Sequence, residues 1–302
     1  MGNRTEIMKE ITDYKNAGQD IIRRQYIKEL SDFTGNDTIV YFSSFGAPGV
    51  NIENSDIQGF MTCINGLNNE NLDLVIHSPG GSSEAAEQIV QYLRSKYKKI
   101  RAIIPQNAMS AATMIACACD EIILGRESAI GPIDPQMIIQ NNITGTSVLP
   151  AHSILEDFKK AKEEIIQNPQ VAPLWITRLQ TIPVGYLDLC EKTIKLSKEK
   201  VEEWLNSYMF KDCEEKKGKE IAEWLGNFQE HKTHGRPINY ELALSKGLNV
   251  TRLEDNQKLQ DKVLSVYHST LLTFDVTNCV KIIENQKGKG LYAIAQKITN
   301  NQ

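Results

Sequence analysis

The chain has 302 residues with 34 Lys and Arg against 38 Asp and Glu, so its formal net charge is −4. Hydrophobic residues make up 41% of it and charged residues 24%, which is ordinary for a globular protein. The basic clusters are short and mixed with acids, so binding to a nucleic acid is not expected. This length suits one large α/β domain or a core domain with a substantial appendage.

The first twenty residues carry acids and amides and no apolar run, which argues against a secretory signal. No window approaches the ~18 uninterrupted apolar residues of a membrane-spanning helix. The six cysteines form no Cys-x-x-Cys pair and lie in apolar contexts, which suits reduced, buried thiols. We therefore expect a cytoplasmic protein with no membrane span.

The N-terminal half alternates between β-rich and helical segments after a charged helical lead-in at 5–33. In chain order the pattern predicts strands at 38–42, 72–77, 100–104 and 121–124, helices at 56–67, 82–97 and 107–119, and a rigid loop at 130–135. Strand, helix and strand at these lengths are typical of stacked parallel β/α units with buried strands. We therefore predict an α/β fold.

The character of the sequence changes after residue 150. Ser153 and Glu156 have the spacing of a capping box, and helical segments follow to about Phe228. The segment 231–237 breaks this run, and a short helix capped by Asn239, a strand at 248–253, a helix at 256–274 and a turn at 288–290 follow. These changes predict three parts: a core at 1–150, a helical insertion serving as lid or assembly region at 151–230, and a return to the core at 231–302.

Two features of the β/α stack could carry chemistry. Gly80 and Gly81 follow a buried strand directly, where bare backbone N–H groups can hold an anionic oxygen, although an ordinary tight turn would look the same. Ser110 opens the next helix among small neighbours, where a hydroxyl is accessible and a helix N-terminus stabilises negative charge. The alternative for Ser110 is a simple N-cap.

A serine nucleophile needs a base, and histidine is the usual one at neutral pH. His231 and His234 are the candidates, since the other three histidines lie in predicted strand or helix contexts that favour structural roles. The His231-x-x-His234 pair could instead bind a metal, but it lacks the Glu of the metalloprotease motif and an obvious third ligand. We therefore expect no metal and no cofactor.

Taken together, these segments resemble the serine dehydrogenase proteinase family, which is related to signal peptide peptidase A and the Clp proteolytic subunit. The resemblance is carried by 78–81, 85–89, 108–116, 120–125, 131–136 and 231–236, and it covers most of the chain. It implies a crotonase/Clp-like spiral of stacked β/α units with an additional helical region. It also implies a serine peptidase acting on peptides or proteins, and a homo-oligomer that shelters the site.

The resemblance implies a role for each residue that matches a family motif. Ser110 matches the nucleophile, and the N–H groups of Gly81 (or Gly80) and Ala111 match the oxyanion-hole positions. His231 falls near the position where Clp subunits keep their catalytic Asp.

The chain departs from both relatives in the general base. The Clp histidine position falls in 131–135, which holds no histidine. Signal peptide peptidase A uses a lysine, for which Lys160 and Lys162 are the nearest alternatives here. We favour histidine, with His234 as the base and His231 as its orienting partner or as an alternative base.

Two other interpretations stay open at this point. The missing base would also suit a catalytically inactive Clp-like scaffold protein. A crotonase-type acyl-CoA enzyme would use the same oxyanion hole without a nucleophile, but the sequence shows no evident acidic pair after the hole.

Overall fold

The computed structural model describes residues 4–13, 18–141, 145–215 and 217–295. Its N-terminal half contains α1 (Arg4–Asp13), α2 (Gly18–Thr34), β1 (Asp37–Ser43), α3 (Asp56–Ile64), β2 (Asn71–His77), α4 (Ser83–Lys96), β3 (Lys99–Ile104), β4 (Asn107–Ala108), α5 (Ala111–Cys117), β5 (Glu121–Leu124), β6 (Ala129–Ile130), β7 (Gln136–Asn141) and β8 (Gly145–Pro150).

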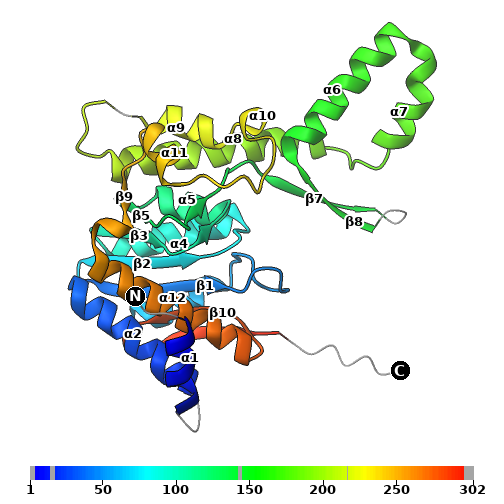
Figure 1. Cartoon of the computed structure of the whole chain (residues 1–302). Helices are drawn as coiled ribbons and strands as arrows, with labels where there is room; N and C mark the ends of the chain where they lie inside the picture. Colours follow the sequence, from blue (N-terminus) through cyan, green and yellow to red (C-terminus); the bar gives the residue numbers. More distant parts are fainter. Residues whose placement is uncertain (1–3, 14–17, 142–144, 216, 296–302) are drawn as a thin grey trace, which may run out of the picture.

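The C-terminal half is mainly helical and ends in a β-hairpin (Figure 1). It contains α6 (Ala151–Gln167), the short helix η1 (Pro169–Val171), α7 (Ala172–Leu179), α8 (Tyr186–Trp204), the π-helical turn η2 (Leu205–Met209), α9 (Gly218–Leu225), α10 (Phe228–His231), α11 (Tyr240–Ser245), β9 (Val250–Arg252), η3 (Leu253–Asp255), α12 (Gln257–Val276), β10 (Cys279–Asn285) and β11 (Gly290–Ile294).

A seven-stranded sheet organises the body, in the order β11-β10-β1-β2-β3-β5-β9. The strands β1, β2, β3, β5 and β9 run parallel to one another, as the β/α pattern predicts. The terminal hairpin β10–β11 extends the sheet in antiparallel fashion beside β1.

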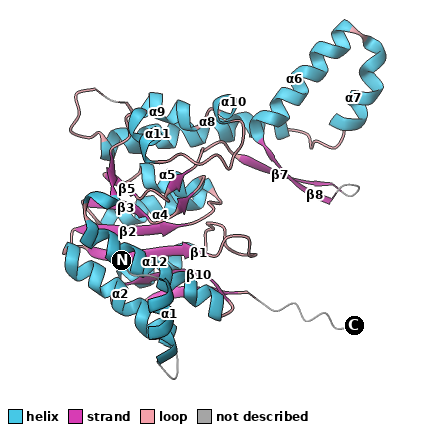
Figure 2. Cartoon of the chain, in the orientation of Figure 1, coloured by secondary structure: helices cyan, strands magenta, loops and turns pink. Residues whose placement is uncertain are grey.

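Side chains alternate between two hydrophobic layers along each central strand, because successive residues of a strand point to opposite faces. In β1, Ile39 and Tyr41 join the layer that contains α3, α4 and α5, whereas Val40 and Phe42 join the layer that contains α2 and α12. Helices therefore cover both faces of the sheet (Figure 2). The predicted α/β class with buried parallel strands is confirmed.

Helices α6 and α7 project from the body as an arm, joined to it through α8 and the β7–β8 hairpin (Figure 1). Helix α7 has no buried residue, although it carries several large apolar side chains. Exposed large apolar residues are frequent over this region: Ile138, Val148, Leu149, Phe158, Ile166, Leu174, Ile176, Val184 and Leu189.

Three details of the sequence prediction are wrong. The capping box does not begin α6, because the helix already starts at Ala151 with Pro150 at its N-cap position. Residues 136–150 form a hairpin that the sequence pattern did not reveal. The predicted turn at 288–290 is present, but the pattern did not predict the two strands, β10 and β11, that it connects. Four of the six free cysteines are buried, as expected, but Cys213 is exposed.

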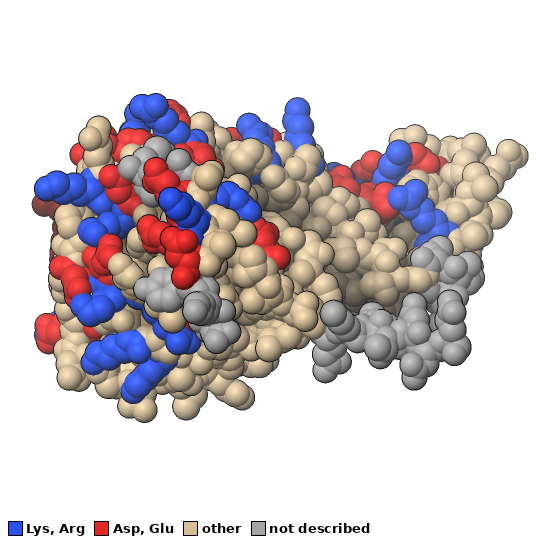
Figure 3. All heavy atoms as spheres, turned by 60° about the horizontal axis from the view of Figure 1, so that its bottom comes forward, with Lys and Arg blue, Asp and Glu red and all other residues tan. Residues whose placement is uncertain are grey.

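Acidic and basic side chains are interspersed over the face of the body seen in Figure 3. None of the described helices is both long and apolar enough to cross a membrane.

His77, at the end of β2, predicts an acid sensitivity of the fold. Its ring is 4% exposed, packs near Phe45 and Tyr267, and accepts a hydrogen bond from the Asn107 N–H at Nδ1. Burial lowers the pKa of His77 from 6.5 to about 4. Between these pH values the unfolded chain binds the proton and the folded chain does not, so stability falls as the pH falls.

We expect His77 to contribute a loss of about 3 kcal/mol in unfolding free energy on going from pH 7 to pH 4. Urea unfolding at several pH values measures this loss, and the His77→Asn variant should show a pH dependence that is flatter by that amount. The same pH dependence in the variant and the parent chain would contradict the prediction.

Candidate active site

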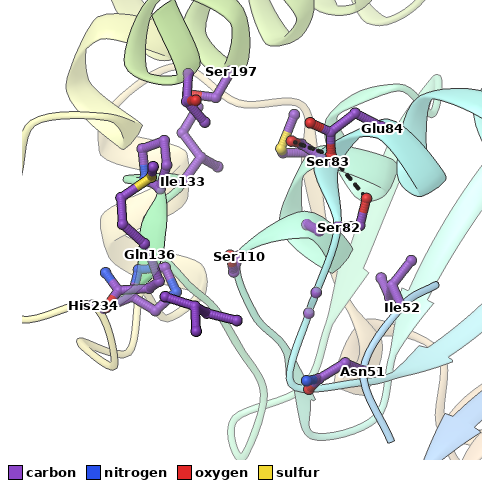
Figure 4. Close-up of a pocket in the computed structure, with 18 of the residues that line it drawn as sticks. Asn51, Ile52, Ser82, Ser83, Glu84, Ser110, Ile133, Gln136, Ser197 and His234 are labelled. Carbon is purple, nitrogen blue, oxygen red and sulfur yellow. Dashed lines mark hydrogen bonds between the residues drawn. The ribbon is translucent and has the colours of Figure 1, made fainter. Parts of the chain in front are cut away.

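A cavity of about 600 Å³ opens where the chain leaves β2 and β4. It is lined by Gly80, Gly81, Ser110, Ala111 and His234, among others (Figure 4). In a parallel sheet, the loops that follow neighbouring strands meet at the same edge. The fold therefore collects residues that are far apart in the sequence.

Ser110 lies at the turn between β4 and α5, with φ 53° and ψ −118°. A positive φ is costly for a residue with a side chain, and such strain is found at functional sites. The turn is held by the Ser78 N–H, which donates to the Asn107 carbonyl (2.9 Å), and by the Met109 N–H, which donates to the Ser78 carbonyl (3.0 Å). The Ser110 hydroxyl makes no capping hydrogen bond to α5, so it is available to a ligand.

Gly80 and Gly81 form a strained loop beside this turn, with φ values of +95° and +154°. Their shape requires glycine: a Cβ on Gly80 would lie 2.5 Å from the Met109 carbonyl oxygen, and one on Gly81 would lie 2.4 Å from the Ile52 nitrogen. The loop thus packs against both the Ser110 turn and the segment around Ile52.

The pairing with Ile52 determines which backbone groups remain free. The Ile52 N–H donates to the Gly80 carbonyl (2.8 Å), and the Ile52 carbonyl accepts from the Ser82 N–H (2.9 Å). In a parallel bridge of this kind, the groups of the middle residue point to the other side. Within the described residues no hydrogen bond uses the N–H of Gly81 or Ala111, whereas the Gly80 N–H donates to the Ser78 hydroxyl (3.2 Å).

The loop after β6 is attached to the Ser110 helix by a buried threonine. The Thr113 hydroxyl donates to the Ala108 carbonyl (2.7 Å) and accepts from the Gly131 N–H (2.9 Å). Ile130 also forms an antiparallel bridge with Ile238 (3.0 and 2.9 Å). This bridge brings the 130–135 loop alongside the segment that contains His234.

The two segments meet in an acid–imidazole pair. The Nδ1 of His234 lies 2.9 Å from Oδ1 of Asp134, whose side chain is fully buried. The second oxygen of Asp134 accepts from the Gln136 amide (3.1 Å). Because a carboxylate only accepts hydrogen bonds, Nδ1 is the donor in this contact, and in the neutral imidazole Nε2 of His234 then carries a free lone pair.

The other candidate bases lie outside the cavity lining. His231 is 3% exposed, and its Nε2 lies 2.8 Å from the Trp224 carbonyl oxygen in the core. Lys160 is 65% exposed on α6 and lies 3.8 Å from Glu164, and Lys162 is exposed on the same helix. Nothing around either lysine desolvates it in the way that a catalytic lysine requires.

Sequence reasoning missed Asp134, although it lies in the loop that matches the Clp histidine position. A search for a histidine at that position overlooked the carboxylate already present there. The structure pairs this Asp with His234, which lies 100 residues further along the chain. A free hydroxyl, an oriented imidazole and two free N–H groups in one cavity are the groups that nucleophilic acyl transfer needs.

The remaining cavity wall is largely apolar on the side of the β7–β8 hairpin and α8. The apolar side chains on that side are Met137, Ile138, Val148 and Leu189, and Met114 of α5 and Ile133 of the 130–135 loop add to the apolar wall.

Comparisons with known proteins agree with these features. The chain is 32% identical over 187 residues to MJ1495, an uncharacterized protein of Methanocaldococcus jannaschii, and 30% identical over 179 residues to MJ0137 of the same organism. These matches cover 60% and 59% of this chain and 53% of each relative, so the chain spans about half the length of the curated relatives it matches.

Among solved structures, a mutant of the 1510-N membrane-bound stomatin-specific protease aligns with 70% of this chain and 79% of its own, at 17% identity and a TM-score of 0.42. That score is too low to carry an argument. The profile of the ClpP-like SDH-type serine proteinases matches residues 50–273, which include every cavity residue named above. The predicted Clp/crotonase-like fold is thereby confirmed, and the chain belongs to the family of ClpP-like SDH-type serine proteinases.

Proposed function

We propose that this chain is a serine peptidase that hydrolyses peptide bonds through an acyl-enzyme on Ser110. The observation that carries the proposal is the buried Asp134 carboxylate 2.9 Å from His234, whose other nitrogen is left free in the cavity that Ser110 also lines. Membership in a serine proteinase family supports it. His231, Lys160 and Lys162 have no part in this proposal, since they lie outside the cavity lining.

In the first half of the reaction, the Ser110 oxygen attacks the peptide carbonyl carbon and His234 Nε2 accepts the hydroxyl proton. The N–H groups of Gly81 and Ala111 donate to the oxyanion that forms, each contributing about 3–4 kcal/mol to the transition state. His234 then gives the proton to the leaving amine as the C–N bond breaks. Asp134 keeps the imidazole oriented and stabilises its charged form.

In the second half, His234 accepts a proton from water and the resulting hydroxide attacks the acyl-enzyme. The ester bond to Ser110 breaks, and His234 returns the proton to the serine oxygen. The product acid leaves and the starting state is restored.

A fluorophosphonate probe tests this proposal directly, because it reacts only with serines activated as nucleophiles. We expect one probe per chain, found by peptide mass spectrometry on the segment that contains Ser110. Heat-denatured protein is the control and should not react. A folded chain that stays unlabelled would favour the inactive-scaffold alternative.

We also propose that the chain forms a homo-oligomer through the arm of α6 and α7. The exposed apolar side chains of α7, such as Leu174 (76%) and Ile176 (59%), support this, because exposed apolar patches mark interaction surfaces. Light scattering at micromolar concentration should give a mass well above 34 kDa. The double variant L174E/I176E should shift it toward the monomer mass, and a monomeric parent chain would contradict the proposal.

A further inference from the structure

The charged side chains that line the cavity are not balanced in sign. Among the described residues that line it, Glu84 is the only carboxylate, and none is a Lys or Arg. The other lining residues are apolar or neutral polar groups. A ligand that fills this cavity therefore meets one anionic group in a mainly apolar wall.

Glu84 is fixed in position by its neighbours. Its carboxylate accepts hydrogen bonds from the hydroxyls of Ser82 (2.8 Å) and Ser83 (3.3 Å). Hydrogen bonds from its own backbone N–H and from the Ser82 hydroxyl lower the pKa of Glu84, so it is ionised at neutral pH. These donors orient the charge but do not neutralise it.

A comparison along the same helix shows what Glu84 lacks. Glu87 also lies on α4, and its carboxylate has Lys200 Nζ at 3.0 Å. Among the ion pairs of the described residues, none includes Glu84. Glu84 thus presents an oriented negative charge to the cavity, and no Lys or Arg among the described residues forms an ion pair with it.

The position of Glu84 indicates which half of a substrate it would meet. Glu84 and His234 lie on opposite sides of Ser110 (Figure 4). A base that also protonates the leaving amine must lie on the leaving-group side of the scissile bond. The acyl half of the substrate then extends away from His234, toward Glu84.

We propose that Glu84 makes this peptidase selective for a Lys or Arg side chain on the acyl side of the scissile bond. The inference rests on the proposed function and adds its substrate class. The apolar stem of a Lys or Arg can lie along Met114, which lines the cavity with Glu84, while its cationic end reaches the carboxylate. Such a pair is partly open to solvent, so its effect is moderate and salt-dependent.

Fluorogenic peptide amides test the assignment in matched pairs. Each pair differs only by Lys or norleucine at the first, second or third acyl-side residue. At one of these positions the parent chain should prefer Lys by about fivefold in kcat/KM, and the preference should shrink at high salt. In E84Q the ratio at that position should fall to about one, and in E84K it should favour a Glu-containing peptide.

The control variant is E87Q, which removes a carboxylate from the same helix outside the cavity and should retain the Lys preference. Equal hydrolysis of Lys and norleucine peptides by the parent chain, or a preference that survives in E84Q, would overturn the assignment. Fluorophosphonate labelling of Ser110, measured on the same preparations, separates this result from a failure of the proposed function. If the parent chain neither reacts with the probe nor cleaves any peptide, the peptidase proposal falls and the Glu84 assignment falls with it.

Discussion

Replacement of Ser110 by alanine is expected to lower the rate of peptide hydrolysis by about 10⁴- to 10⁶-fold and to abolish fluorophosphonate labelling. The substitution removes only the hydroxyl oxygen that would form the acyl-enzyme. The free N–H groups of Gly81 and Ala111 would remain, so the residual rate should still exceed that of the reaction in water. Initial rates with a fluorogenic peptide at saturating and limiting concentration measure the effect on kcat and kcat/KM.

Ser197 provides a matched control for this experiment. It lines the same cavity from α8, but its hydroxyl donates to the Ile194 carbonyl of its own helix (3.1 Å). Ser197→Ala therefore removes the same atom type from the same cavity and should change the rate only a few-fold. Equal losses in the two variants, or hydrolysis that persists in Ser110→Ala, would remove Ser110 from the mechanism.

Much of the body could be predicted because its pattern is local. The central strands β1, β2, β3 and β5 each contain a short run rich in apolar residues, and buried parallel strands have this composition. The cap at Asn239 is also a local signal, and its side chain accepts the expected hydrogen bond from its helix. Ser82 and Asn256 cap their helices in the same way. Most predictions that depend on a few adjacent residues are correct for this reason, but the capping box at Ser153 is not, because the helix already starts at Ala151.

Strand β10 could not be predicted, because polar residues interrupt its apolar pattern. Lys281, Glu284 and Asn285 are all buried in it. Their partners come from distant parts of the chain: Asp56 for Lys281 (2.9 Å) and Arg23 for Glu284 (2.8 Å). A buried charge is tolerated only when such a partner exists, and the sequence does not reveal the partner.

The site residues also divide into those that a local sequence pattern predicts and those that depend on contacts between distant parts of the chain. The Gly80–Gly81 loop and Ser110 each follow a strand within a few residues, so their approach follows from the β/α order. The contact between Asp134 and His234 joins residues that are 100 positions apart, and it depends on the bridge between Ile130 and Ile238. His234 is the favoured base in the sequence, with His231 as its orienting partner or alternative, and burial of His231 beside Trp224 separates the two in the fold.

The Asp134→Asn variant tests the part of the site that sequence reasoning missed. An asparagine occupies the same volume but can offer its N–H₂ group to His234 Nδ1, which stabilises the tautomer with its proton on Nε2. That tautomer cannot accept the proton of Ser110, so kcat should fall by about 10⁴-fold while KM changes little. The loss should lessen at alkaline pH if hydroxide can replace the base.

A double-mutant comparison shows whether Asp134 acts through His234. If Asp134 acts through His234, His234→Ala alone and the double variant with Asp134→Asn should have nearly the same rate. Once the imidazole is gone, Asp134 has no base left to orient, so its loss adds no further decrease. Glu230→Gln is the matched control: its carboxylate contacts Trp224 and Lys246 outside the cavity, so the rate should be retained. Additive losses in the double variant would mean that Asp134 affects the rate by a route other than the orientation of His234.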